Sequence, residues 1–360
     1  MKILAIETSC DETAAAVVEN GTTILGNAVA SSSAMHEKYG GIVPEVAARE
    51  QLKCVIPTIQ EALKQANTTL ASIDSLAITV GPGLIGSLLI GVETAKTMAF
   101  TTGKPIIPVN HVLAHMYANF VESSQQNSSQ SSTRDNIKFP AISLVVSGGH
   151  TELFLMESEK KLTWLGGTLD DAAGEAFDKT ARLLGFGNGG GVAIQETAKK
   201  LNRETPSGEI SLPRPLLRDD TLNFSFSGLK TAILREVNKL KEKNQLNEDV
   251  VRQLAFETQE SITDVLVIKT LRAIKKYNAQ SILLSGGVAA NLRLREKFHS
   301  EIQNSCLAGR QAKLSIKFFV PPVSLCTDNA VYIASYAYFR GAPVDWHKLT
   351  AVPDLSVEDV

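Results

Sequence analysis

Short runs of mostly apolar residues, each ending in small or polar residues, recur along this chain. Residues 3–6, 141–146 and 281–284 are three such runs, and each leads into glycine, serine or acidic residues. Runs of this length, bounded by turn-forming residues, are typical of buried strands. A second strand pattern follows the first two runs, at 14–18 and 153–156, whereas the third run leads into a helix from Leu292. We therefore predict that the first two segments are the two halves of an internal duplication.

Strand and helix patterns alternate between these segments. Residues 75–80 predict a buried strand, Gly81-Pro82-Gly83 a turn, residues 85–100 an apolar helix and residues 106–109 another strand. Residues 250–275 predict a long amphipathic helix. This alternation predicts an α/β fold.

The length of 360 residues favours two domains. Residues 123–136 are low in complexity, rich in serine and glutamine, and are predicted to form a flexible loop between domains. The expected organisation is an N-terminal lobe at 1–122, this loop, a C-terminal lobe with a helical insertion at 137–340, and a tail at 341–360.

Composition excludes several classes of protein. The net charge of −2 gives no support to a chain wrapped wholesale around nucleic acid. The sequence enters a strand pattern at once and has no apolar run of about 18 residues, so we expect a cytosolic protein that does not contact a membrane. The four cysteines form no Cys-x-x-Cys pair, which argues against a zinc ribbon.

A metal site is predicted from two histidines. His111 and His115 lie four residues apart in a segment with helical apolar spacing, so both imidazoles project from one helix face. Asp328, in a short polar segment before another apolar helix, offers a third ligand. Two imidazoles and a carboxylate with open positions suit a catalytic transition metal better than a closed structural site. The alternative is a pair of hydrogen-bonded structural histidines.

Acidic and glycine-rich turns follow the strands. Asp11 and Glu12 follow the first strand and are candidates for orienting a nucleophile or accepting its proton, although acids also close turns. The glycines at 148–149 and 286–287 would let backbone N–H groups approach an anionic ligand. Asn291 closely follows the second pair of glycines and is a candidate either for ligand binding or for a helix N-cap alone.

Nine blocks, in order from residue 1 to about residue 340, resemble the TsaD family of tRNA N6-adenosine threonylcarbamoyltransferases. They are residues 1–18 with Ile-Glu-Thr-Ser-Cys-Asp-Glu-Thr, residues 36–45, 81–84, the His111/His115 pair, residues 147–151, 170–179, 224–230, 285–288 and 327–329. The resemblance implies an actin-like/Hsp70-like nucleotide-binding fold (the ASKHA fold), with two ribonuclease-H-like lobes and a central cleft. It also implies transfer of the threonylcarbamoyl group from threonylcarbamoyl-AMP to N6 of adenosine 37, in tRNAs that read codons beginning with A.

The resemblance assigns a role to individual residues. It gives His111, His115 and Asp328 to one divalent metal ion, iron(II) with zinc or magnesium as alternatives. We expect this ion to lie across the cleft between the lobes, with the imidazoles from one lobe and Asp328 from the other. The residues it assigns to substrate binding are Val145, Val146, Ser147, Gly148 and Gly149 for the phosphate or acyl end, and Asp178, Gly191 and Asn291 for ribose and adenine. Two departures are present: Asn188-Gly189-Gly190-Gly191-Val192 replaces the usual Tyr-Pro-Gly-Gly-Pro turn, and Gln51 stands where a histidine is common.

The implied partners are tRNA, a TsaB-like paralogue and a TsaE-like ATPase. Three other functions stay open on the residues alone. A kinase or ATPase of this fold would hold magnesium through carboxylates without imidazoles. A metalloprotease would carry Glu beside the first histidine, where Val112 stands. A nucleotide-gated scaffold would have no use for so many carboxylates.

Overall fold

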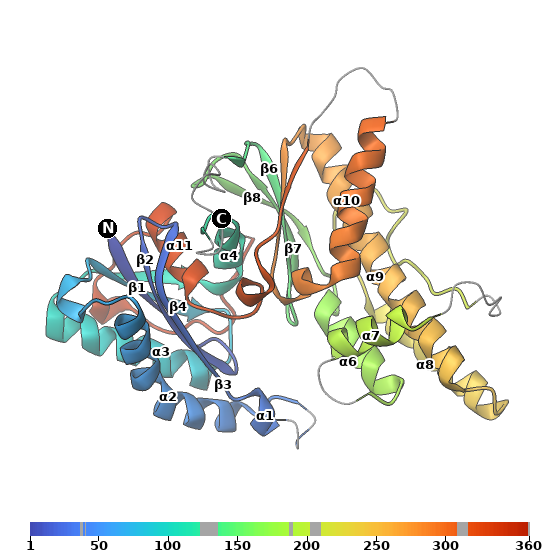
Figure 1. Ribbon diagram of the computed structural model, residues 1–360, viewed down its shortest axis with the longest axis horizontal. Coiled ribbons are helices and arrows are strands. Elements are labelled where there is room, and N and C mark those ends of the chain that lie inside the picture. The colour runs from blue at the N-terminus through green and yellow to red at the C-terminus, as the bar shows by residue number, and fades with distance from the viewer. Residues whose placement is uncertain are drawn as a thin grey trace. The chain divides into compact units, whose positions relative to one another are not determined.

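The computed structural model describes residues 1–36, 39, 41–122, 136–186, 190–201, 210–307 and 316–358, apart from the side chains of 305–307. The chain divides into two compact units (Figure 1). The first unit comprises Met1–Lys138, Glu157–Leu162 and Val320–Val360, and the second comprises Phe139–Met156 and Thr163–Phe319.

A mixed sheet forms the centre of the first unit. Its strands are β1 (Lys2–Glu7), β2 (Glu12–Glu19), β3 (Thr23–Ser31), β4 (Ser75–Gly81) and β5 (Ile106–Asn110), in the order β3-β2-β1-β4-β5. Strand β2 pairs antiparallel with both β1 and β3, whereas β4 pairs parallel with β1 and β5 parallel with β4. Parallel neighbours need a crossover, which the helices between the strands supply.

The second sheet repeats this topology. It contains β6 (Ala141–Val146), β7 (Thr151–Met156), β8 (Leu162–Gly167), β9 (Ser281–Ser285) and β10 (Lys317–Phe319), in the order β10-β9-β6-β7-β8. Strand β7 is antiparallel to β6, whereas β9 is parallel to β6 and β10 to β9, as in the first sheet. The predicted α/β class and internal duplication are confirmed.

Helices cover both faces of the first sheet. They are α1 (Ser33–His36), α2 (Pro44–Gln65), α3 (Ile85–Thr102), α4 (His111–His115) and α11 (Val331–Phe339). Alternate residues of β1 point to opposite faces. Ile3 and Ala5 join a core cluster with residues of α4 and α11, and Leu4 and Ile6 join one with residues of α2 and α3. The four single-turn 3₁₀ helices of this unit are Leu70–Ser72, Met116–Asn119, Val323–Leu325 and Trp346–Lys348 within the described ranges.

The second unit carries helices α6 (Ala173–Leu183), α7 (Gly190–Lys199), α8 (Ser227–Glu242), α9 (Glu248–Tyr277) and α10 (Leu292–Leu307), with a 3₁₀ turn at Gly287–Ala290. The long helix predicted at 250–275 is confirmed as α9, but the prediction that this helix is amphipathic is wrong. Polar side chains such as Thr258, Ser261 and Lys269 are fully buried along it. They stay inside because they donate to carbonyl groups, as Lys269 does to Thr221 and Asn223.

The division into units differs from the expected lobe boundaries. Residues 320–340 were expected in the C-terminal lobe and 341–360 in a tail, yet both belong to the first unit. The reason is α11, which packs against β1 and β2. Most of the loop expected at 123–136 lies outside the described residues. Along the described chain, none of the helices combines the length and apolar character that crossing a bilayer requires.

Candidate functional site

The two predicted metal-binding histidines lie on a very short helix that follows β5. Asn110 ends β5, and its side-chain oxygen accepts hydrogen bonds from the N–H groups of Val112 and Leu113, which caps α4. One turn of helix then separates His111 from His115. Their rings lie edge to face, with the ring centroids 4.7 Å apart. Both histidines are buried, so neither is a solvated surface residue.

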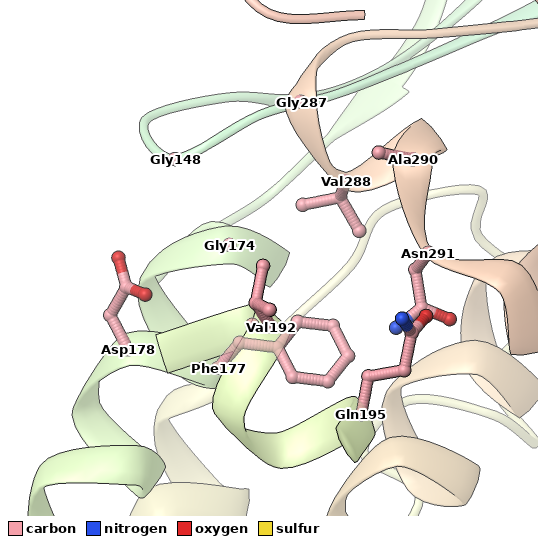
Figure 2. A pocket seen from close by; sticks show the side chains of 11 residues that line it. Gly148, Gly174, Phe177, Asp178, Val192, Gln195, Gly287, Val288, Ala290 and Asn291 are labelled. Atoms are coloured by element: carbon pink, nitrogen blue, oxygen red, sulfur yellow. The ribbon is translucent and has the colours of Figure 1, made fainter. Parts of the chain in front are cut away.

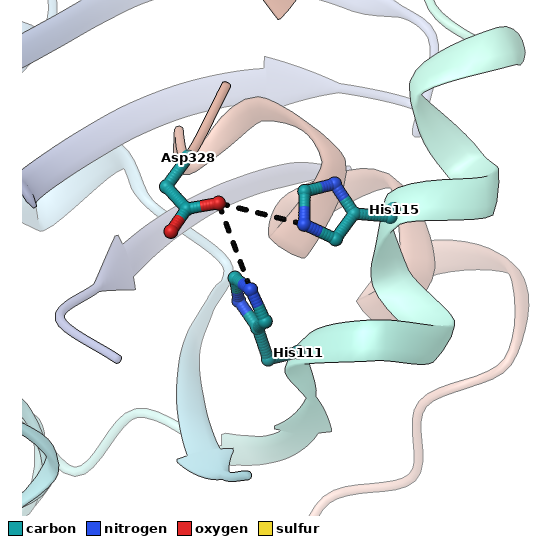
Figure 3. Close-up of side chains that lie close together, drawn as sticks. All are labelled: His111, His115 and Asp328. Carbon is teal, nitrogen blue, oxygen red and sulfur yellow. Dashed lines mark ion pairs between the residues drawn. The ribbon is translucent and has the colours of Figure 1, made fainter. Parts of the chain in front are cut away.

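Asp328 completes the cluster (Figure 3). Its Oδ1 atom lies 3.6 Å from Nε2 of His111 and 3.4 Å from Nε2 of His115. The Tyr332 hydroxyl donates to the same carboxylate oxygen at 3.3 Å. All three predicted ligands belong to the first unit. The expectation that Asp328 comes from the other lobe, across a cleft, is therefore wrong, because Val320–Val360 returns to the first unit with α11.

The donor atoms fit a transition metal ion. One ligand atom from each residue lies within 4.8 Å of the others. Ligand atoms about 2.0–2.1 Å from a tetrahedral metal are roughly 3.3 Å apart, close to the two Nε2–Oδ1 distances. The Nδ1 atom of His115 is buried and has no hydrogen-bond partner in the described part of the chain. Two imidazoles and one carboxylate are a donor set for iron, zinc or related metals rather than for magnesium.

The two histidines differ in their electrostatic surroundings. Burial lowers the pKa of His111, but the charges of Glu7 and Asp328 outweigh this and raise the pKa to about 9. Burial keeps the pKa of His115 below its ordinary value. Burial raises the pKa of Asp328, and the charge of His111 together with the His115 contact reverses this and lowers it. A metal ion bound to Nε2 of His111 would therefore have to displace a proton.

The acidic turn predicted to be catalytic lies in the same unit. Burial, followed by the hydrogen bond and charge of Asp11 and the charge of Asp328, raises the pKa of Glu12 to about 9. Gln51 of α2 donates to the backbone carbonyls of Cys10 and Glu12, both at 3.0 Å. The glutamine that departs from the usual histidine thus still supplies a donor to this turn. Burial raises the pKa of the Cys10 thiol, so this cysteine is not a thiolate nucleophile.

The second unit contains a pocket of about 250 Å³ (Figure 2). This volume lies just below the usual range for ligand pockets, roughly 300–1,000 Å³. The turn after β6, helices α6 and α7 and the segment between β9 and α10 supply its lining residues, which are Gly148, Gly174, Phe177, Asp178, Gly191, Val192, Gln195, Gly287, Val288, Ala290 and Asn291. Four of the eight predicted substrate-binding residues are among them: Gly148, Asp178, Gly191 and Asn291.

The turn after β6 is shaped by close packing of α6. Its residues close on themselves, since the Ser147 N–H donates to His150 O and the His150 N–H donates to Ser147 Oγ. A Cβ atom at Gly174, near the start of α6, would lie 2.5 Å from Ser147 O, whereas a Cβ at Gly148 or Gly149 would meet nothing within 4 Å. The side chains of Val145 and Val146 are fully buried in β6 and do not line the pocket.

Asp178 holds the start of α7. Its carboxylate accepts hydrogen bonds from the N–H groups of Gly190 and Gly191, and burial raises its pKa despite them. A Cβ atom at Gly190 would lie 2.5 Å from Asp178 Oδ1, so this contact requires glycine. A Cβ at Gly191 would have its nearest neighbour 3.9 Å away. Of the turn that departs from the family pattern, residues 188 and 189 lie outside the described residues.

Asn291 has the structural role that its sequence position also predicted. Its side-chain oxygen accepts from the Leu294 N–H and its amide donates to Gln259, so it caps α10 while lining the pocket. Gln195 accepts from the Leu292 N–H, which connects α7 to the start of α10.

Several residues of both sites carried no usable sequence signal. Phe177 and Gln195 line the pocket, and Glu7 and Tyr332 contact the metal-ligand cluster. Gln195 is one polar residue among many on an exposed helix. Glu7 and His111 are 104 residues apart in the sequence, and the pairing of β1 with β4 and of β4 with β5 brings them together.

Solved structures that share the fold are distant in sequence. The full-length HypF structure matches with a TM-score of 0.57 and 11% identity, covering 94% of this chain and 46% of HypF. Component A of the (R)-2-hydroxyglutaryl-CoA dehydratase of Acidaminococcus fermentans matches with a TM-score of 0.51 and 13% identity, covering 94% and 98%. These matches confirm the actin-like/Hsp70-like nucleotide-binding fold.

Curated relatives are much closer. A protein of Persephonella marina is 45% identical over 353 residues, which cover 96% of this chain and 93% of the relative. One of Syntrophomonas wolfei is 46% identical over 338 residues, covering 94% and 92%. Both are named tRNA N6-adenosine threonylcarbamoyltransferase, and the family model of that description, TsaD, matches residues 23–335. The chain is a member of the TsaD family of tRNA N6-adenosine threonylcarbamoyltransferases.

Proposed function

We propose that this enzyme transfers the threonylcarbamoyl group from threonylcarbamoyl-AMP to N6 of adenosine 37, in tRNAs that read codons beginning with A. The N6 nitrogen attacks the carbamoyl carbon, the bond from that carbon to the phosphate oxygen breaks, AMP leaves with the electron pair, and N6 gives up a proton. The observation that carries the proposal is the family match across residues 23–335. AMP is a good leaving group, so positioning and charge stabilisation matter more than activation of a nucleophile.

The adenosine part of the donor is assigned to the pocket of the second unit. Phe177, Val192 and Val288 give it apolar walls, while Asp178 and Asn291 supply polar atoms. The open backbone at Gly148 and Gly149 lets N–H groups approach the phosphate, and the start of the eleven-residue helix α6 lies against the same turn. We assign the phosphate or acyl end to the backbone of Val145–Gly149 on this ground.

The proton from N6 is assigned to the acidic turn. With its pKa near 9, Glu12 keeps its own proton at neutral pH and donates a hydrogen bond to Asp11. Asp11 is therefore the carboxylate that we assign as acceptor of the proton from N6. Gln51 holds the backbone on both sides of Asp11, so the turn is fixed before substrate binds.

His111, His115 and Asp328 would hold one divalent metal ion. Such an ion supplies a Lewis acid that polarises a carbonyl or phosphoryl oxygen. Iron(II) is proposed because two histidines and one carboxylate with open positions are typical of non-haem iron(II) sites. Zinc is the alternative, whereas magnesium, also expected from the sequence, prefers oxygen ligands to imidazoles.

Partners are proposed because the chain has a net charge of −2, which gives weak attraction to polyanionic tRNA. Apolar side chains are exposed along the neighbouring helices α2 and α3: Leu52 and Ile56 on α2, and Ile85 and Leu89 on α3. Each pair is four residues apart and so shares one helix face. We assign this surface, the α2/α3 face, to a TsaB-like paralogue. A TsaE-like ATPase is the second proposed partner, and the reaction is placed in the cytosol.

The function is tested by reconstitution with threonylcarbamoyl-AMP, unmodified tRNA and the two partners with ATP. Mass spectrometry of tRNA nucleosides should detect N6-threonylcarbamoyladenosine, and a transcript with guanosine at position 37 should give none.

The same assay tests the partner requirement, because turnover should be several times faster with partners than without. Leu52→Asp should lose this stimulation and keep the slow rate of the isolated chain. Absence of the modified nucleoside would refute the reaction, and equal rates with and without partners would refute the partner requirement.

Metal content tests the assigned ligands. Elemental analysis of the wild type should find about one transition metal ion per chain, and the His111→Ala/His115→Ala variant should retain almost none. His347→Ala removes an exposed imidazole outside the cluster and should match the wild type. Equal metal content in the wild type and the double variant would remove these ligands from the proposal.

Gly148→Val tests the phosphate turn. The valine side chain has free space in the unliganded protein, so folding should be unchanged, but it would block an anion from the backbone N–H groups. Calorimetric titration with AMP should show at least about a tenfold loss of affinity, equivalent to about 1.4 kcal/mol. Gly228→Val, at another open glycine of the second unit, is the control. Unaltered AMP affinity in Gly148→Val would take the turn out of the site.

The pH dependence of stability tests the raised pKa of Glu12. Because this pKa is about 9 when folded against an ordinary 4.5, the folded protein keeps a proton that the unfolded chain loses between these values. Metal-free wild type should therefore lose stability as pH rises from about 5 to about 8. Glu12→Gln cannot ionise, so its stability relative to wild type should increase across that range.

Urea unfolding at each pH measures this difference. Glu45→Gln, which removes an exposed carboxylate on α2, is the control and should follow the wild type at every pH. If the curves of wild type and Glu12→Gln run parallel from about pH 5 to about pH 8, Glu12 does not hold a proton at neutral pH.

A further inference from the structure

A buried carboxylate outside the predicted ligand set contacts His111. Glu7 is the last residue of β1 and is fully buried. Its Oε2 atom lies 3.0 Å from His111 Nδ1 and accepts a hydrogen bond from Thr79 Oγ1 at 2.5 Å, while its Oε1 atom accepts from the Ser9 N–H at 2.6 Å. Burying a carboxylate is costly unless its oxygens are paired. Both oxygens of Glu7 are paired, and one of them is directed at a metal ligand.

We propose that Glu7 is a positioning residue for the metal centre, which fixes the orientation of His111 and presents its Nε2 atom to the metal. A carboxylate only accepts, so the His111 nitrogen facing Glu7 must carry the hydrogen. The other nitrogen, Nε2, is the one that lies 3.6 Å from Asp328. Metal-ligating histidines commonly donate their second N–H to a carboxylate, which also increases the basicity of the ligating nitrogen.

The surroundings of Glu7 support a fixed orientation. Thr79 is a fully buried residue of β4, and Ser9 lies two residues beyond Glu7, the end of β1. The hydrogen bonds from Thr79 and Ser9 hold the Glu7 carboxylate independently of His111. Ser9 Oγ also lies near His111 Nδ1, at 3.3 Å, but the contact with the carboxylate is shorter and charged, and therefore stronger.

His115 provides an internal contrast. Its Nδ1 atom is buried without a hydrogen-bond partner among the described residues, so no carboxylate orients this ring from the side away from Asp328. His115 is held by packing against Tyr332, with ring centroids 4.4 Å apart. The two imidazoles of the cluster are thus positioned by different means, and loss of Glu7 should affect His111 alone.

The inference rests on the proposed metal centre and is tested with Zn²⁺ on metal-free, full-length protein. Competition with a chromophoric chelator should show that Glu7→Gln weakens Zn²⁺ binding by roughly 10- to 100-fold, as is common for such partners. Glu7→Asp, which keeps the charge but shortens the side chain, should recover part of the loss. The control is Glu152→Gln on β7, another buried carboxylate, which accepts from Trp164 in the second unit and should leave Zn²⁺ affinity unchanged.

Nitrogen-15 NMR of the zinc-loaded protein separates positioning from a general loss of stability. In wild type the His111 Nδ1 hydrogen should exchange slowly with solvent, and in Glu7→Gln it should exchange faster, while the His115 ring signals stay unchanged. If Glu7→Gln does not fold, Thr79→Val removes one hydrogen bond from the carboxylate and should still lower Zn²⁺ affinity. Wild type that fails to bind Zn²⁺ would overturn the metal centre itself. Wild type that binds, with equal affinity in the folded Glu7 or Thr79 variant, would overturn only the role of Glu7.

Discussion

The pairing of buried charges at the end of β1 is the constraint on which the first unit depends. Glu7, His111, His115 and Asp328 lie where a sheet meets helices α4 and α11, and His111 forms ion pairs with the buried Glu7 and with the partly buried Asp328. Removing one partner would leave another charge buried and unpaired. The apolar cluster around them contains many alanines, among them Ala5, Ala14, Ala114, Ala330 and Ala334. Small side chains let α4 and α11 approach the sheet closely enough for these contacts.

The pocket of the second unit follows a different principle, because the polar residues that line it also hold helix starts together. Asn291 caps α10, Asp178 accepts from the first N–H groups of α7, and Gln195 accepts from the Leu292 N–H. A ligand that used these side chains would have to share hydrogen bonds with the backbone or replace them. A substitution at Asn291 would remove a helix cap together with any ligand contact. A substitution at Gly148 leaves these hydrogen bonds in place, and for this reason it tests ligand binding more directly.

Local patterns predicted what depends on local spacing. The strand runs predicted both hairpins, the i, i+4 spacing predicted the paired imidazoles, and the polar segment before an apolar helix pointed to Asp328. Contacts set by long-range pairing were not predictable: Glu7 looks like the end of a buried strand, and its role appears only through the order of β1, β4 and β5. The return of α11 to the first unit was missed because a helix that is apolar on all sides fits either core. Likewise, Ser261 and Lys269, buried on α9, have hydrogen-bond partners far away in the sequence.

Asp328 connects the metal-ligand cluster to the acidic turn. Its charge is one of the causes that raise the pKa of Glu12, and it also raises the pKa of His111. A divalent cation held beside Asp328 would offset that negative charge, which would release the proton of His111 and remove the contribution of Asp328 to the raised pKa of Glu12, whose largest cause is burial. Protonation in the turn would then depend on whether the cluster holds its metal. Groups that interact in this way titrate as a set, and the acid–base behaviour of the turn therefore belongs to the whole cluster rather than to Glu12 alone.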